Sequence, residues 1–93
     1  MNTYYALMSE FETAEIPLAD VCEKFFGMEP ATALRKASTQ GLPIPVHKIG
    51  GQKSPWLVNA TDLAALIDKR REQAAKDHKL YTDHYHIIFS DEL

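Results

Sequence analysis

The segment from residue 16 to residue 26 carries apolar residues at i, i+3, i+4 and i+7, the spacing of one helix face. These residues are Leu18, Val21, Cys22, Phe25 and Phe26. Pro17 suits the first turn of a helix, because its missing N–H would have no partner there. Gly27 is typical of a residue that ends a helix in the left-handed conformation. The pattern therefore predicts a short helix that Ile16-Pro17-Leu18 opens and Gly27 ends.

A second short helix is predicted from Pro30 to about Thr39, where Gln40-Gly41 ends it. Its narrow apolar side consists of Ala33, Leu34 and Ala37. Only two residues separate Gly27 from Pro30. Two short helices joined by a tight turn that contains glycine form the helix-turn-helix pattern.

The next segment predicts a β-hairpin. Two prolines in residues 42–49 disfavour a helix and fit an edge strand. Gly50-Gly51 is a strong hairpin signal, and a return strand is expected over residues 54–58, around Trp56.

A long helix is predicted after the hairpin, with Asn59 as its N-cap and its end at about Lys79. Its apolar stripe consists of Leu63, Ala64, Leu66 and Ile67. The two ends of the chain are less regular. Residues 2–11 suit a short strand or an entry helix, and residues 81–89 suit a last short strand or an arm.

These elements predict one small α+β domain, a winged helix-turn-helix with a two-stranded wing and a long C-terminal helix. The 93 residues, 45% of them hydrophobic and 25% charged, suit a single folded soluble domain. We expect an N-terminal arm or strand over 1–14, the winged helix-turn-helix over 15–79, and a tail with a possible strand over 80–93. No secretory signal or membrane-spanning run is recognisable, so the sequence predicts a cytoplasmic protein without membrane contact.

The charge is unevenly distributed along the chain. The net charge is −3, yet residues 1–30 hold six acids and one base. Residues 31–56 hold four cations and no acid. Because salt screens charges beyond about 8–10 Å, the local sign decides what a surface attracts. The middle of the chain is therefore a candidate for contact with phosphates, and double-stranded DNA is the expected partner.

Two groups of polar residues are candidates for DNA contact. The helix that starts at Pro30 would present one polar face to a major groove, where arginine can bond guanine in a fork. The hairpin would bring cations and two glycines close to the sugar-phosphate backbone. The candidates are Thr32, Arg35, Lys36, Thr39 and Gln40 on the helix, and Lys48, Gly50, Gly51, Gln52, Lys53 and Ser54 on the wing.

The stretch from Glu15 to about Ala75 resembles the pyocin activator family. The resemblance rests on Ile16-Pro17-Leu18, Arg35-Lys36-Ala37, the Gly41-Leu42-Pro43-Ile44-Pro45 step, Gln52-Lys53-Ser54-Pro55-Trp56-Leu57-Val58, and Asp62-Leu63-Ala64. It implies a DNA-binding transcriptional activator of prophage or bacteriocin-type genes. It also supports Arg35 and Lys36 on the recognition helix and Lys53 and Ser54 on the wing. The layout looks more distantly like phage excisionases, so a recombination directionality factor that bends attachment-site DNA is the alternative function.

A third possibility is a phage-type protein-interaction module that does not bind DNA, which the overall acidity favours and the basic middle disfavours. RNA polymerase or a recombinase are the protein partners that the two DNA-binding functions would require. The aromatic N-terminal segment and the tail suggest a homodimer or a cooperative array on DNA, with the protein associated with the nucleoid. We expect no enzyme activity, because no triad, phosphate loop or metal-hydrolase motif is present. We also expect no cofactor and no metal, because His84 and His86 lack a full ligand set.

Overall fold

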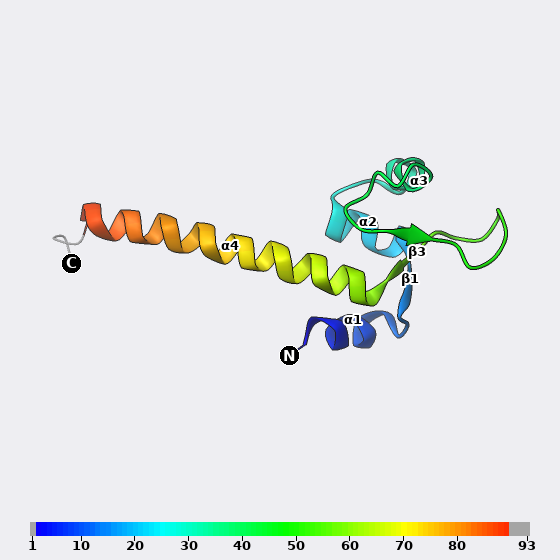
Figure 1. Ribbon diagram of the computed structural model, residues 1–93, viewed down its shortest axis with the longest axis horizontal. Helices are drawn as coiled ribbons and strands as arrows, with labels where there is room; N and C mark the ends of the chain where they lie inside the picture. The colour runs from blue at the N-terminus through cyan, green and yellow to red at the C-terminus, as the bar shows by residue number, and fades with distance from the viewer. Residues whose placement is uncertain (1, 90–93) are drawn as a thin grey trace.

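The computed structural model describes the backbone of residues 2–89 and the side chains of residues 2–82. This part of the chain combines four helices with a three-stranded antiparallel sheet, so the predicted α+β fold class is confirmed (Figure 1). The elements are α1 (Thr3–Phe11), β1 (Glu15–Pro17), α2 (Leu18–Phe26), α3 (Pro30–Ala37), β2 (Val46–His47), β3 (Leu57–Asn59) and α4 (Ala60–Phe89).

The small sheet is antiparallel and has the strand order β1-β3-β2. Its centre is Val58, which pairs with Ile16 on one side and with Val46 on the other. The prediction of a helix opening at Ile16 was wrong by two residues, because residues 15–17 form a third strand. Pro17 is tolerated there because β1 is an edge strand, where a missing N–H breaks no ladder. The predicted hairpin strands are also shorter than expected, since Pro45 directly precedes β2 and Pro55 precedes β3.

The core lies where the sheet, α2, α3 and the first turns of α4 meet. Every element contributes to it, and α1 closes it from below by packing against α4 (Figure 1). The fully buried large side chains are Ile16, Leu18, Val21, Cys22, Val58 and Leu63. Cys22 therefore lies in the core, as its place in the helical stripe predicted.

Residues 3–11 form helix α1, so the strand alternative for the N-terminal segment is wrong. Asn2 caps the helix, since its side-chain oxygen accepts the N–H of Tyr4 at 2.8 Å. Leu7 is buried, and Tyr4, Met8 and Phe11 pack against the core beside it. These four positions follow the helical spacing i, i+3, i+4 and i+7, which explains why the segment is a helix.

A tight turn joins α2 to α3 as predicted. Gly27 ends α2 in the left-handed conformation, with φ 65°, and its backbone N–H donates to the carbonyl of Cys22. Pro30 then opens α3, which packs against α2. The helix ends at Ala37, two residues earlier than expected, because residues 38–40 turn away and Gln40 adopts a left-handed φ of 55°.

The strand alternative for the C-terminal tail is wrong as far as the structure describes it, because α4 continues to Phe89. Residues 90–93 lie outside the described part. The helix continues because residues 60–89 contain neither glycine nor proline. Asn59 caps it as predicted, accepting the N–H of Thr61 at 2.8 Å.

Beyond its first two turns, α4 extends away from the rest of the molecule (Figure 1). Each described side chain from Asp68 to Thr82 is exposed. The molecule is therefore elongated, with extents of 64 × 28 × 16 Å. Within the described residues, α4 and the other helices lack the length of apolar sequence that a membrane span requires.

Candidate nucleic-acid interface

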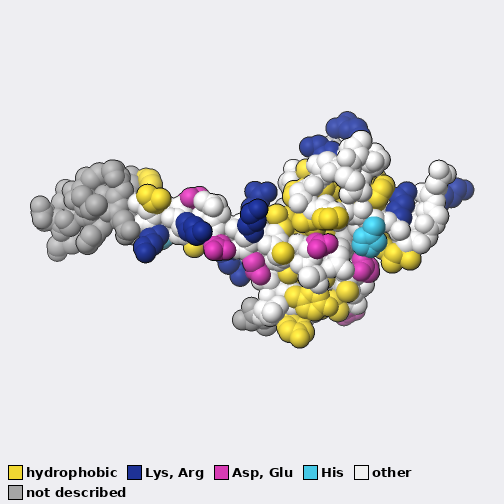
Figure 2. Space-filling model, viewed as in Figure 1, with side chains coloured by type: hydrophobic (Ala, Val, Ile, Leu, Met, Phe, Trp, Pro, Cys, Tyr) yellow, Lys and Arg dark blue, Asp and Glu magenta, His cyan; other side chains and the backbone are white. Residues whose placement is uncertain are grey.

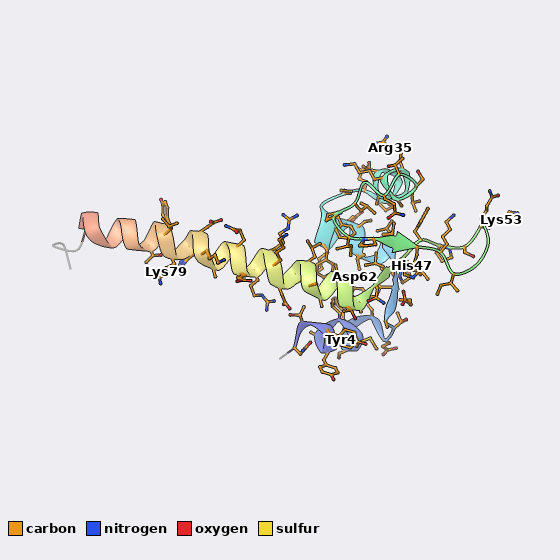
Figure 3. The ribbon with its side chains drawn as sticks, viewed as in Figure 1. Tyr4, Arg35, His47, Lys53, Asp62 and Lys79 are labelled. Carbon is orange, nitrogen blue, oxygen red and sulfur yellow. The ribbon has the colours of Figure 1, made fainter. Side chains whose placement is uncertain are left out.

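Helix α3 presents two cations to solvent. Ala33 and Ala37 are fully buried one turn apart and fix the inner face of α3. Arg35 and Lys36 are consequently exposed, and Arg35 points away from the body (Figure 3). Neither side chain forms a salt bridge with a described residue. Both charges are therefore available to an anionic partner.

The second cationic element is the hairpin loop, residues 48–56, between β2 and β3. Lys53 is exposed near its tip, far from the core (Figure 3). Lys48 folds back against the loop, where its Nζ lies 4.9 Å from the centre of the Trp56 ring and donates to the carbonyl of Gln52 at 2.8 Å. Lys48 thus holds the base of the loop, and Lys53 places a positive charge near its tip.

The two glycines of the hairpin loop differ in their surroundings. A Cβ atom at Gly50 would overlap the Oγ atom of Ser54, whereas a Cβ at Gly51 would meet open space. The N–H of Ser54 donates to the carbonyl of Gly51 at 2.9 Å and closes the tip. Gly50 therefore allows Ser54 to pack closely against the backbone of the loop. At Gly51 the backbone of the loop faces open space without a side chain.

The remaining candidates on and after α3 make local contacts. Gln40 pairs with the backbone of Val46: its Nε2 donates to the carbonyl at 3.2 Å, and its Oε1 accepts the N–H at 3.4 Å. Thr39 donates its hydroxyl to the carbonyl of Lys36 at 3.2 Å, and Thr32 is half-buried. Gln40 thus holds the turn after α3 against β2. Its role in DNA contact stays a prediction, as do those of Thr32 and Thr39.

A shallow groove separates α3 from the hairpin loop. It is lined by Pro17, Leu18, Ala19, Leu34, Lys48, Ser54, Pro55 and Trp56. The sequence placed Leu34 on the buried side of its helix, but the side chain is 46% exposed. The sequence did contain a signal for this exposure. Ala33 and Ala37 are four residues apart and define the buried face, and Leu34 is rotated by about 100° around the helix axis from Ala33.

Charge is segregated over this surface. Figure 2 shows Lys and Arg side chains over α3 and along the hairpin loop, while the visible Asp and Glu side chains lie over the lower body and along α4. More cations follow on the exposed part of α4, where Lys69, Arg70 and Arg71 are consecutive. The α3 and hairpin-loop edge is therefore locally cationic although the whole chain is acidic.

The base of the hairpin loop is tied to the sheet by polar side chains. Nε2 of His47 lies 2.8 Å from Oε2 of Glu15, and Nδ2 of Asn59 donates to Oε1 of Glu15 at 3.0 Å. These residues come from β2, β1 and β3. The carboxylate of Glu15 on β1 therefore lies against side chains from both other strands.

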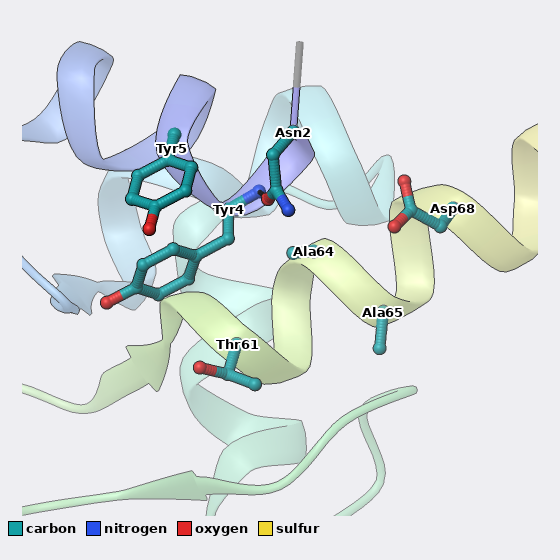
Figure 4. A pocket seen from close by; sticks show the side chains of 7 residues that line it. All are labelled: Asn2, Tyr4, Tyr5, Thr61, Ala64, Ala65 and Asp68. Carbon is teal, nitrogen blue, oxygen red and sulfur yellow. Dashed lines mark hydrogen bonds between the residues drawn. The ribbon is translucent and has the colours of Figure 1, made fainter.

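A second hollow lies between the N-terminal segment and α4 (Figure 4). Its walls include Tyr4 and Tyr5, whose rings meet edge to face at 5.5 Å, and Asp68, which accepts the hydroxyl of Thr3. The carboxylate of Asp68 is already engaged in this hydrogen bond, so the hollow offers little to a ligand or a catalytic step. Across the described residues, no group of three His, Cys, Asp or Glu side chains could hold a metal ion.

The family model described as pyocin activator protein PrtN matches residues 3–74 of the chain. The match includes α1, which lies outside the resemblance noted from the sequence, and it ends within α4. No curated protein and no solved structure matches the chain.

Proposed function

We propose that this chain, which belongs to the pyocin activator family, is a sequence-specific DNA-binding activator of prophage or bacteriocin-type genes. The family is a regulatory one, and membership points to a prophage-related transcriptional activator. The observation that supports DNA binding is the exposed pair Arg35 and Lys36 on α3, with Lys53 on the adjacent hairpin loop. Neither α3 cation has an acidic partner among the described residues.

In this proposal the protein works as a winged helix-turn-helix. Helix α3 enters a major groove, where Arg35 can bond the O6 and N7 atoms of guanine, and α2 braces it from behind. The hairpin loop acts as the wing, and Lys53 contacts a phosphate, which positions the protein without choosing a sequence. Each phosphate that the protein neutralises should add about −0.9 to the slope of log affinity against log salt.

The direct test is to incubate the purified protein with sheared genomic DNA at moderate salt and to sequence the retained fragments. We expect fragments just upstream of promoters, and RNA polymerase is then the partner. Fragments at an attachment site would instead support the excisionase-like function, with a recombinase as partner. Uniform retention that slightly higher salt abolishes would contradict sequence specificity. Complete lack of retention would leave the protein-interaction module as the function.

We also propose that the protein acts as a homodimer on DNA and that α4 joins the two copies. Most of this helix lies outside the body, and a helix exposed on all sides gains little stability by itself. Ile67, Ala74 and Tyr81 follow one another at seven-residue intervals along it, and Leu80 lies next to this row. This spacing is the one that pairs helices side by side. Leu80 is 72% exposed.

Leu80→Glu is therefore expected to convert the dimer into a monomer, since it places a charge in the contact between helices. Light scattering should give about twice the chain mass of 10.5 kDa for the unmodified protein and the single chain mass for the variant. Lys79→Gln, next to it on the same exposed helix, should keep the dimer. A monomeric unmodified protein at every concentration and on DNA would refute the dimer.

A further inference from the structure

The groove between α3 and the hairpin loop is mostly apolar, although Lys48 lines it and Arg35 follows Leu34 on α3. Leu34 of α3 and Trp56 and Pro55 of the loop line it, with Pro17 at the end of β1 and Ala19 in the first turn of α2. An isolated exposed leucine is ordinary on a protein surface, but here Leu34 lines the same groove as the ring of Trp56. The lining therefore calls for an occupant with an apolar part.

The fold does not require Leu34 for packing. Ala33 and Ala37 are fully buried and anchor α3 on α2, whereas Leu34 remains 46% exposed. Arg35 follows Leu34 on α3, and Lys48 lines the same groove from the hairpin loop. A partner that fits this surface is apolar where it meets Leu34 and anionic nearby.

Double-stranded DNA has that composition in its major groove. Its phosphates carry the negative charge, and the 5-methyl group of thymine is the apolar feature that a base edge presents there. Because α3 would lie in the major groove in the proposed function, Leu34 would face base edges next to the one that Arg35 contacts. The other lining residues, on α2 and the loop, keep water from that contact.

We propose that Leu34 is a specificity-determining residue that recognises thymine through its 5-methyl group. This inference rests on the proposed DNA-binding function and names part of its target: a thymine beside the base pair that Arg35 contacts. The apolar groove shields the methyl group from water, and Lys53 on the hairpin loop contacts a phosphate of the same segment.

The test removes the methyl group from the DNA. Genomic fragments that the protein retains are copied with dTTP or with dUTP, which differ at thymine positions only in the 5-methyl group. We expect uracil to weaken binding of the unmodified protein by about fourfold for each thymine contacted, the effect of burying one methyl group. Leu34→Ala should bind the thymine fragments more weakly and lose the difference between the two DNAs.

Two further variants make the result specific to Leu34. Lys53→Ala should bind both DNAs more weakly and keep the ratio between them, because it removes a phosphate contact. Leu34→Met, which keeps an apolar side chain of similar size, should preserve most of the ratio. Circular dichroism checks that each variant is folded.

Equal affinity of the unmodified protein for thymine and uracil fragments would overturn the inference while leaving DNA binding intact. A full thymine preference in Leu34→Ala would overturn it as well, since the methyl group would then be recognised elsewhere. If no genomic fragment is retained at all, the proposed function itself fails, and this outcome is distinct from the other two.

Discussion

Replacing Arg35 with alanine is expected to weaken binding to specific DNA by about 5- to 150-fold, the range that loss of a bidentate arginine–guanine contact gives. Arg35 is exposed at the outer face of α3 and has no acidic partner among the described residues, so the guanidinium is available to DNA. Fluorescence anisotropy with a retained genomic fragment measures the affinity. The same fragment with single base changes should show relaxed selectivity at one position.

Arg70→Ala is the matched control, since Arg70 is an equally exposed arginine on α4, outside the proposed interface. It should change the affinity by far less than Arg35→Ala at the same salt concentration. Similar losses in the two variants would mean that only net charge matters, which would contradict contact through α3. An unchanged affinity in Arg35→Ala would exclude the arginine from the interface.

The largest expected effect on stability is that of Leu63→Ala. Leu63 has no exposed surface and belongs to the first turns of α4, where α1, α2 and the sheet converge. Truncating a buried leucine removes its transfer free energy and leaves a cavity, which lowers the free energy of unfolding by about 2–5 kcal/mol. That is a large share of the stability of a domain of this size. Urea titration followed by circular dichroism measures the change.

Leu34→Ala makes the same chemical change at a half-exposed position and is the control for Leu63→Ala. Its free energy of unfolding should fall by less than half as much, because part of the Leu34 side chain already contacts water. Equal losses in both variants would show that Leu34 supports the core. In that case Leu34 would line the groove because it packs against the core, and it would not be a DNA-recognition residue.

The elements that the sequence predicted well are those with local signals. Gly27 and Pro30 bracket the turn between α2 and α3, and Asn59 caps α4, as helix-terminus chemistry requires. The outward position of Arg35 follows from helical periodicity in the same way. Each of these signals acts within a few residues and needs no knowledge of the tertiary structure.

The elements that the sequence missed depend on distant partners. Strand β1 has only three residues and exists because it pairs with β3, some forty positions later. Residues 81–89 alternate like a strand, but the helix already begun at Ala60 extends through them without a breaking residue. At the site, the pairing of Gln40 with Val46 depends on the left-handed turn after α3. No local pattern could show that this amide has a backbone partner.

The length of α4 has a consequence for the DNA that the protein can occupy. At about 1.5 Å per residue, a helix of 30 residues measures about 45 Å, which exceeds the roughly 34 Å of one DNA turn. In a dimer joined along this helix, α4 sets the distance between the two DNA-binding domains. The spacing of the two half-sites then depends on which part of α4 the two copies share. Inserting residues into the outer part of α4 would change the preferred spacing of the operator while leaving each half-site sequence the same.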